Sequence, residues 1–289
     1  MRLRSLKMEN FFYKIKLLIL RILGYEKPLR VALLKYLSLK FTTFRPHYET
    51  LVYESSKNAL KLGYDEINII ELGVAGGDGI KTLVKYKKKV EKILNIKINI
   101  IGFDTGAGLP HTTFKQDLPF FWKKGDYTNQ NLSNLEKEFA DVKIYLGNIS
   151  STLDEFVNNN KKKIGLIIFD LDLYSSTKSF LNKIHELSKK NLLLPRTFCY
   201  FDDLFLADYC LDDSNGEPLA ISEFNKEFKD LKLGKFFDHI NDFKFPLAKG
   251  QIYTLHDLNN VDYEKYIGIY NSESLSGKKK DKFRSLLDD

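Results

Sequence analysis

Four acidic residues that follow two apolar runs form the clearest chemical feature of the sequence. Asp170 and Asp172 come directly after one run, and the pair Asp202-Asp203 comes after the next. Clustered carboxylates repel one another unless a cation or a proton compensates their charge, and carboxylate oxygens select a hard cation such as Mg²⁺. Such an ion lowers the pKa of a bound hydroxyl group, and a neighbouring carboxylate can take the proton. The pattern therefore predicts a metal site at Asp170, Asp202 and Asp203.

The same acids leave alternatives open. Asp172 or Ser175 can cap the helix expected over residues 175–190, because side-chain oxygens accept hydrogen bonds from the free amides of a helix start. An Asp-x-Asp pair also occurs in phosphatases of the haloacid dehalogenase type and in metal-using glycosyltransferases, although Tyr174 stands where the phosphatase motif has threonine. A non-catalytic scaffold that retains the fold is the third alternative.

The second chemical feature is the glycine-rich segment at residues 71–79, ELGVAGGDG. It follows an apolar run and opens a helical stretch, where glycines let the backbone turn sharply and approach a ligand closely. Its spacing matches neither the dinucleotide fingerprint nor the P-loop. Glu71 suits a cationic ligand or a hydroxyl group, and Asp104, which ends the next apolar run, is placed as a ribose ligand. A plain turn with a capping acid is the alternative.

Both features lie in a regular alternation of apolar runs and helical stretches. Such alternation predicts an α/β, Rossmann-like doubly wound fold with a mostly parallel sheet. Two further runs without a long helix between them predict an antiparallel hairpin at the sheet edge. The expected strands are 67–72, 97–103, 142–146, 164–169, 197–201, 234–240 and 250–256, and the expected helices are 48–62, 79–94, 130–139, 150–158, 175–190 and 217–230. Since ligands bind at the carboxyl ends of such strands, the glycine turn and the acids should meet there.

Residues 65–257 resemble the class I S-adenosylmethionine-dependent methyltransferases. In that family an acid and a glycine-rich turn follow the first strand, and a second acid closes the next strand. The resemblance implies that S-adenosylmethionine is the cofactor, with its methionine part on the glycine turn, its ribose on the second acid and its adenine near the end of the third strand. The cofactor-binding residues that it implies are Glu71, Gly73, Val74, Gly76, Gly77, Asp104 and Asn148.

Four ordered blocks resemble the macrocin O-methyltransferase (TylF-type) family within that class. They are ELGV at 71–74, FDTGAGLP at 103–110, DLDLYSST at 170–177 and the pair Asp202-Asp203. The resemblance implies Mg²⁺-dependent O-methylation of a hydroxyl group on a sugar or glycosylated metabolite. It assigns the metal to Asp170, Asp202 and Asp203, and it makes Asp170 the candidate proton acceptor. Residues 195–197, PRT, depart from the Pro-Gly-Gly that the family has before the fifth strand.

The net charge of +7 is concentrated at the N-terminus. Residues 1–45 hold eleven basic and two acidic residues, whereas the rest of the chain is close to neutral. Residues 11–23 are too short and too charged to span a bilayer, but they form an amphipathic pattern that suits packing on the domain, on a second subunit or on a membrane surface. We therefore predict a basic amphipathic helical extension over 1–46, a methyltransferase domain over 47–276 and a mobile Lys-rich tail over 277–289.

The composition excludes several classes of protein. Two cysteines among 289 residues exclude a disulfide framework and a cysteine-rich zinc module, and they favour a reducing, cytoplasmic setting. The near-neutral body gives no reason to expect a nucleic-acid partner. The expected partner is a small-molecule or glycan acceptor, with peripheral contact to the inner membrane face through residues 1–45 and a homo-oligomer as further expectations.

Overall fold

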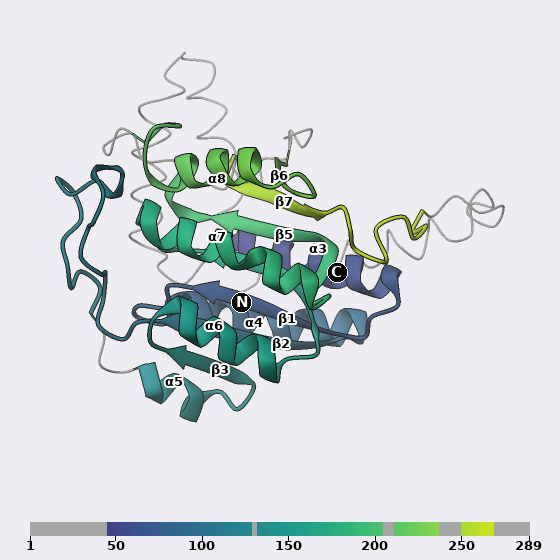
Figure 1. Cartoon of the computed structure of the whole chain (residues 1–289). Helices are drawn as coiled ribbons and strands as arrows, with labels where there is room; N and C mark the ends of the chain where they lie inside the picture. Colours follow the sequence, from purple (N-terminus) through teal and green to yellow (C-terminus); the bar gives the residue numbers. More distant parts are fainter. Residues whose placement is uncertain (1–44, 129–131, 205–210, 237–249, 269–289) are drawn as a thin grey trace, which may run out of the picture.

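A computed structural model of the chain describes residues 45–128, 132–204, 211–236 and 250–268 (Figure 1). The expected N-terminal extension lies outside these ranges except for its last two residues, and the expected tail over 277–289 lies wholly outside them. The predictions for both segments therefore stay predictions. Among the helices of the described ranges, none has the length and apolar character needed to cross a membrane.

A seven-stranded mixed sheet with the order β3-β2-β1-β4-β5-β7-β6 forms the centre of the fold. The first five strands in this order are parallel, whereas β5, β7 and β6 pair antiparallel. This confirms the doubly wound fold and its antiparallel edge hairpin. The strands are β1 (Glu66–Leu72), β2 (Lys97–Asp104), β3 (Val142–Leu146), β4 (Lys163–Phe169), β5 (Leu193–Phe201), β6 (Leu231–Lys235) and β7 (Ile252–Asp257).

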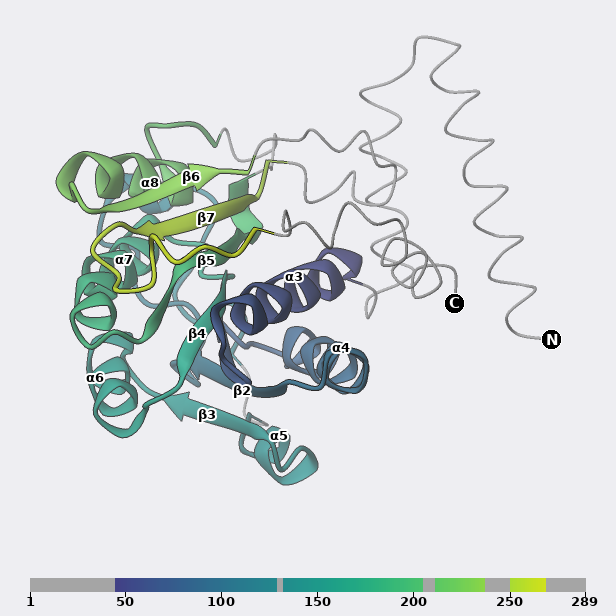
Figure 2. The same cartoon turned by 90° about the vertical axis from the view of Figure 1, so that its right-hand side faces the viewer.

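Helices cover both faces of the sheet, as Figures 1 and 2 show. Two separate apolar cores result, one between the sheet and each helical layer. Every residue of the central strand β4 is buried, which explains its apolar sequence after Lys163. One layer holds α3 (Pro46–Leu62), α4 (Asp78–Leu94) and α5 (Leu132–Glu138), and the other holds α6 (Ile149–Asn159), α7 (Tyr174–Lys189) and α8 (Gly216–Glu227).

Two strands begin earlier than the sequence predicts. β5 begins at Leu193 instead of residue 197, and Pro195 is tolerated inside it because the β4–β5 register breaks between Ile164 and Leu166. β6 begins at Leu231 instead of residue 234 because Phe228 takes an extended backbone that ends α8 three residues before the predicted end. Both differences lie away from the carboxyl ends of β1, β2 and β4.

The helix α3 begins at Pro46, a favourable first helical position, and ends at Gly63 in the left-handed conformation. The predicted domain boundary between residues 46 and 47 thus falls after the first residue of this helix. The strand order reverses between β1 and β4, which is the point where doubly wound sheets bind ligands. A ligand site is therefore expected at the loops that follow β1, β2, β4 and β5.

Candidate active site

The glycine turn joins β1 to α4 at the carboxyl edge of the sheet. Gly73 and Gly77 have φ values of +83° and +82°, which glycine adopts without steric cost. A Cβ atom on Gly73 would lie 1.8 Å from the carbonyl oxygen of Asp170, so this glycine lets the ends of β1 and β4 approach each other. A Cβ atom on Gly76 would meet no atom within 4 Å. This part of the turn borders open space, as a cofactor cradle requires.

Asp104 ends β2 and fixes two turns at once. Its Oδ2 atom accepts hydrogen bonds from the amides of Val74 at 2.9 Å and Ala75 at 3.0 Å, and its Oδ1 atom accepts one from the amide of Gly106 at 2.7 Å. A carboxylate offers about four acceptor positions, so this side chain retains capacity for a further donor. The structure thus brings Asp104 and the glycine turn together.

Glu71 lies beneath the glycine turn. Its side chain is 1% exposed, Tyr48 donates a hydrogen bond to its Oε1 atom at 3.3 Å, and its Oε2 atom has no hydrogen-bond partner. A Cβ atom on Gly79 would lie 1.8 Å from Oε1, so the carboxyl group packs against the first turn of α4. Burial raises the pKa of Glu71 to about 8, against the opposing effect of Arg45. The group is therefore mostly protonated at neutral pH.

Asn148 directly precedes α6, at the same edge of the sheet. Its carbonyl oxygen accepts hydrogen bonds from the amides of Ser151 and Thr152, and its side chain is exposed. The neighbouring Gly147 donates its amide to the carbonyl oxygen of Asp104 at 2.9 Å. The structure therefore places Asn148 beside the end of β2, next to the acid expected to bind ribose.

The acids after β4 and β5 lie at this edge together with Glu217, which no sequence motif marks. We call these five residues the acid group: Asp170, Asp172, Asp202, Asp203 and Glu217. The amide of Asp172 donates to Oδ2 of Asp203 at 3.1 Å, and the amide of Asp203 donates to Oε2 of Glu217 at 3.1 Å. Asp172 has a φ of +60°, a left-handed conformation that aspartate tolerates better than most residues. Glu217 lies in the first turn of α8 and is fully buried.

Burial and mutual repulsion raise the pKa values of these carboxyl groups. Burial and the neighbouring Asp202 raise the pKa of Asp170 to about 7. Burial, Asp170 and Asp202 raise the pKa of Asp172 to about 8. The pKa values of Asp203 and Glu217 lie well above their usual range, chiefly because both groups are buried. The acid group therefore stores unfavourable charge that a proton or a bound cation relieves.

Arg45 brings a cation to this acid group. Its Nη1 atom lies 3.4 Å from Oδ2 of Asp170 and donates to the hydroxyl of Tyr48 at 2.5 Å. Burial opposes its charge, but Tyr48 and Asp170 outweigh that effect and raise the pKa of Arg45 further above its usual range. Arg45 falls in the predicted N-terminal extension over 1–46. No local pattern marks a contact between residues 125 positions apart in the chain.

The predicted metal ligands offer suitable donor atoms but no finished ligand set. Among the residues described, no group of three or more His, Cys, Asp or Glu side chains is arranged to hold a metal ion. Oδ1 of Asp202 accepts a hydrogen bond from Tyr200 at 2.7 Å, and Oδ2 of Asp203 is engaged by Asp172. The carboxylate oxygens of Asp170, Asp202 and Asp203 are of the type that Mg²⁺ prefers. The metal site stays a prediction.

Asp117 connects the long loop between β2 and α5 to the acid group. Its side chain is fully buried, and its Oδ1 atom accepts a hydrogen bond from the amide of Ser175 in the first turn of α7 at 2.7 Å. Its Oδ2 atom accepts the amides of Thr113 and Phe114. The alternative that Asp172 or Ser175 caps this helix is not found, because the cap residue of α7 is Leu173, which makes no side-chain cap hydrogen bond, and Asp117 accepts the Ser175 amide instead.

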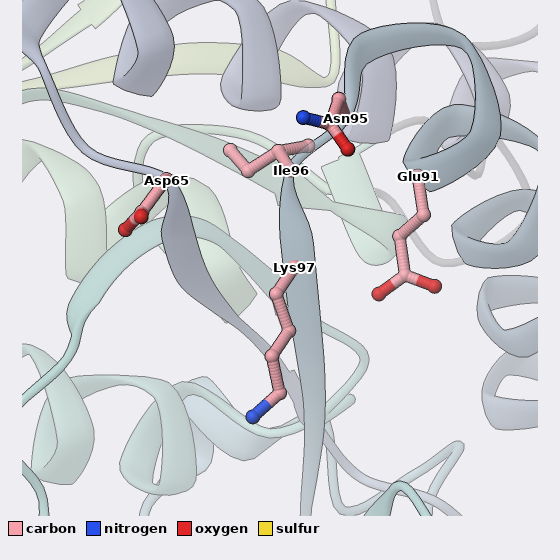
Figure 3. Close-up of a pocket in the computed structure, with 5 residues that line it drawn as sticks. All are labelled: Asp65, Glu91, Asn95, Ile96 and Lys97. Carbon is pink, nitrogen blue, oxygen red and sulfur yellow. The ribbon is translucent and has the colours of Figure 1, made fainter.

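A pocket lies at the opposite, amino edge of the sheet (Figure 3). It has a volume of about 440 Å³ and contains none of the predicted site residues. The Glu91 carboxylate in its wall accepts the amide of Ile98 at 2.8 Å and pairs with Lys87 at 3.2 Å, so its charge is already compensated. The residues that line the pocket are Asp65, Glu91, Asn95, Ile96 and Lys97.

The architecture defines a class I methyltransferase fold. The calicheamicin methyltransferase CalS11 has a similar structure, with a TM-score of 0.50 and 20% sequence identity over 84% of this chain and 91% of that chain. A second structure, titled as the apo form of CalS11, TDP-rhamnose 3′-O-methyltransferase, gives a TM-score of 0.44 at 20% identity over 75% and 83%. An O-methyltransferase from Bacillus cereus in complex with SAH gives 0.39 at 12% identity over 78% and 96%.

At 20% identity, the similarity to the first of these structures, with its TM-score of 0.50, shows the fold alone, and the activity must be argued from the site. No protein-family model and no curated protein matches the sequence. The predicted membership in the macrocin O-methyltransferase family therefore stays a prediction.

Proposed function

We propose that the protein is an S-adenosylmethionine-dependent O-methyltransferase that acts on a hydroxyl group of a sugar or glycosylated metabolite. The observation that carries this proposal is the direct contact between the glycine turn and the acid group. The amide of Asp170 donates to the carbonyl oxygen of Leu72 at 2.9 Å, and Gly73 lies against the backbone of Asp170. A cofactor on the turn and an acceptor at the acids would therefore lie side by side.

The residues of the turn suit the separate parts of the cofactor. The open side of Gly76 leaves room for the methionine part, and the Asp104 carboxylate, which accepts three backbone amides, keeps capacity to accept a ribose hydroxyl group. The acid group favours a cationic ligand, and the sulfonium group of S-adenosylmethionine carries a positive charge. A pyrophosphate would be repelled here, which argues against a dinucleotide.

The proposed reaction moves one methyl group. A lone pair of the acceptor oxygen forms a bond to the methyl carbon, the bond from carbon to sulfur breaks, and its electron pair stays on the sulfur as the neutral thioether. The acceptor hydroxyl proton passes to the carboxylate of Asp170. Because the sulfonium is already a good leaving group, the protein mainly aligns the two substrates and accepts the proton.

We also propose that Mg²⁺ supports this reaction. Asp170, Asp202 and Asp203 would hold the ion, which when bound lowers the pKa of a sugar hydroxyl group. The support is the chemistry of the donors and the excess of acidic groups at this edge of the sheet, for which Arg45 supplies one opposite charge. Removal of the ion should then weaken methyl transfer while cofactor binding persists.

The test is a methyl-transfer assay with isotope-labelled S-adenosylmethionine and a panel of sugar, nucleotide-sugar and glycoside acceptors, with and without a chelator. Calorimetry measures cofactor binding in parallel. Labelled product in at least one acceptor pool supports the proposal, and loss of product with the chelator supports the metal. Absence of cofactor binding contradicts the methyltransferase, and phosphate release from phosphomonoesters would favour the phosphatase alternative.

A further inference from the structure

The loop of residues 105–128, which follows β2, exposes a group of aromatic side chains beside the acids. The exposed fractions are 51% for Phe114, 71% for Phe120, 37% for Phe121 and 56% for Tyr127. Figure 1 shows this loop at the left, extending beyond the ends of the strands to which the acids are attached. Large apolar rings that gather on one exposed segment mark a binding surface more often than chance exposure.

Two of the exposed rings, Phe121 and Tyr127, contact a buried tryptophan. Trp122 is 6% exposed and belongs to an apolar cluster with Leu118 and Leu173, the residue that directly precedes α7. The ring of Phe121 meets Trp122 edge to face at 4.5 Å between centroids, and Tyr127 lies 5.9 Å from Trp122. The contacts with Trp122 restrict the rings of Phe121 and Tyr127, which lowers the entropic cost of ordering them on a ligand.

Cations alternate with these rings. Lys115, Lys123 and Lys124 are exposed, and none of them has a carboxylate within ion-pair distance in the part of the chain that the structure describes. Exposed aromatic rings next to these ammonium groups suit a ligand that combines a flat ring with an anionic group. Neither a neutral glycoside nor an apolar aglycone would use all of these features.

The surface also lies at the right place relative to the reacting centre. Phe114 contacts Tyr174 edge to face with ring centroids 6.0 Å apart, and Asp117 bonds the start of α7, which follows the Asp170-x-Asp172 motif. The acids repel phosphates, so an anionic group of the acceptor must lie outside them. The lysines of the loop offer that outer position.

We propose that the loop of residues 105–128 binds a nucleoside diphosphate carried by the acceptor, which makes the acceptor a nucleotide-linked sugar. This inference rests on the proposed function. The exposed rings stack on the base, the three lysines bind the diphosphate, and the sugar hydroxyl group reaches the acids around Asp170. An anionic membrane surface would also use rings and lysines, and the experiment below separates it from a nucleotide.

The experiment measures binding of UDP, dTDP, GDP and ADP to the full chain by calorimetry. We expect at least one of them to bind, and we expect Phe120→Ser and the double variant Lys123→Gln with Lys124→Gln each to weaken binding about tenfold. The matched controls are Tyr266→Ser, a ring that is 73% exposed elsewhere, and Lys88→Gln with Lys92→Gln on α4. The controls should bind as tightly as the wild type, and thermal unfolding verifies that all variants are folded.

Three results would overturn the inference. In the first, none of the four diphosphates binds the wild type. In the second, the loop variants bind the diphosphate as well as the controls do. In the third, the loop variants keep the diphosphate but lose binding to phosphatidylglycerol vesicles, which would assign the surface to a membrane. Binding of S-adenosylmethionine is measured on the same samples, so that failure of the proposed function is seen separately.

Discussion

Two glutamates of strand β1 lie at its opposite ends and in opposite electrostatic states. At the amino end, the Glu66 carboxylate bonds Lys162, Asn99 and Lys97, and the hydrogen bonds from Lys162 and Asn99 lower its pKa to about 2. At the carboxyl end, Glu71 has one orphaned oxygen and a pKa raised to about 8 by burial. Two carboxyl groups only five positions apart on one strand thus differ in their hydrogen-bond partners and in the direction of their pKa shifts.

The difference extends from these two residues to the two edges of the sheet. Carboxylates at the amino edge lie beside lysines, whereas those at the carboxyl edge lie beside one another and beside Arg45. A sequence under selection for stability alone would remove such repulsion. Perturbed carboxyl groups that gather in one place are typical of functional sites. The comparison therefore supports the proposal that the reaction takes place at the carboxyl edge, and this support does not depend on any motif.

The largest expected effect is on turnover. Asp170→Asn should lower the rate of methyl transfer by about 10²-fold to 10⁴-fold because the proton acceptor is lost. Asp65→Asn, at the amino edge, should leave the rate within about twofold. Labelled-methyl assays measure both, with cofactor binding as the control for folding. Equal rates for the two variants would remove Asp170 from the proposed chemistry.

The second effect separates two glycines of the same turn. Gly73→Ala should destabilise the fold by about 3 kcal/mol or more, because the new Cβ atom collides with the backbone of Asp170 at a φ of +83°. Gly76→Ala meets open space, so its stability should stay within about 0.5 kcal/mol of the wild type. Its affinity for S-adenosylmethionine should nevertheless fall. Unchanged affinity in a folded Gly76→Ala variant would contradict a cofactor at this turn.

The third effect compares the pH dependence of stability for the two glutamates. The folded state holds the Glu71 proton more tightly than the unfolded state, so this group stabilises the fold at low pH and loses that contribution as the pH rises from about 4.5 to about 8. Glu71→Gln should therefore gain stability relative to the wild type over that range, by up to about 1.4 kcal/mol for each pH unit.

Glu66 should behave in the opposite way. Its depressed pKa stabilises the fold above about 4.5, and the contribution disappears as the pH falls toward about 2. Glu66→Gln should lose about 1 kcal/mol or less at neutral pH, since the ion pairs are partly exposed. Urea unfolding at several pH values measures both variants, and parallel curves for the two would contradict the contrast between the edges.

The smallest effect concerns carboxylates that accept backbone amides at each edge. Asp117→Ala removes the cap of α7 and should cost about 1 to 2 kcal/mol. Glu91→Ala removes the acceptor of the Ile98 amide at a more exposed position and should cost less than about 1 kcal/mol. Chemical unfolding ranks the two variants. Only Asp117→Ala should also raise KM for the acceptor, because it releases the loop beside the acids.

Much of the fold could be predicted because its signals are local. The unbroken apolar run of β4 and the glycines of the turn after β1 are contiguous in the sequence, and the rule that strand ends converge brings Asp104, Asp170 and Asp202 to one edge. The antiparallel hairpin could be predicted because the sequence has no long helical pattern between the two apolar runs. These features depend on neighbours in sequence and on topology.

The residues that were missed depend on distant contacts. Arg45 reaches Asp170 across 125 positions, and Asp117 reaches Ser175 across 58. A carboxylate that accepts a backbone amide leaves no mark in the sequence, because the donor residue has no required type. The start of β5 was also missed, since a proline inside a strand reads as a break unless the register shift around it is known.

The hydrogen bonds of Asp104 affect how fast the proposed cofactor can bind. This side chain ties the turn after β1 to the turn after β2 before any ligand is present. Both turns therefore lose their backbone freedom when the protein folds. Binding of the ligand then costs little further conformational entropy. Binding should then resemble entry into a rigid receptor, with an association rate limited by diffusion and orientation more than by loop closure.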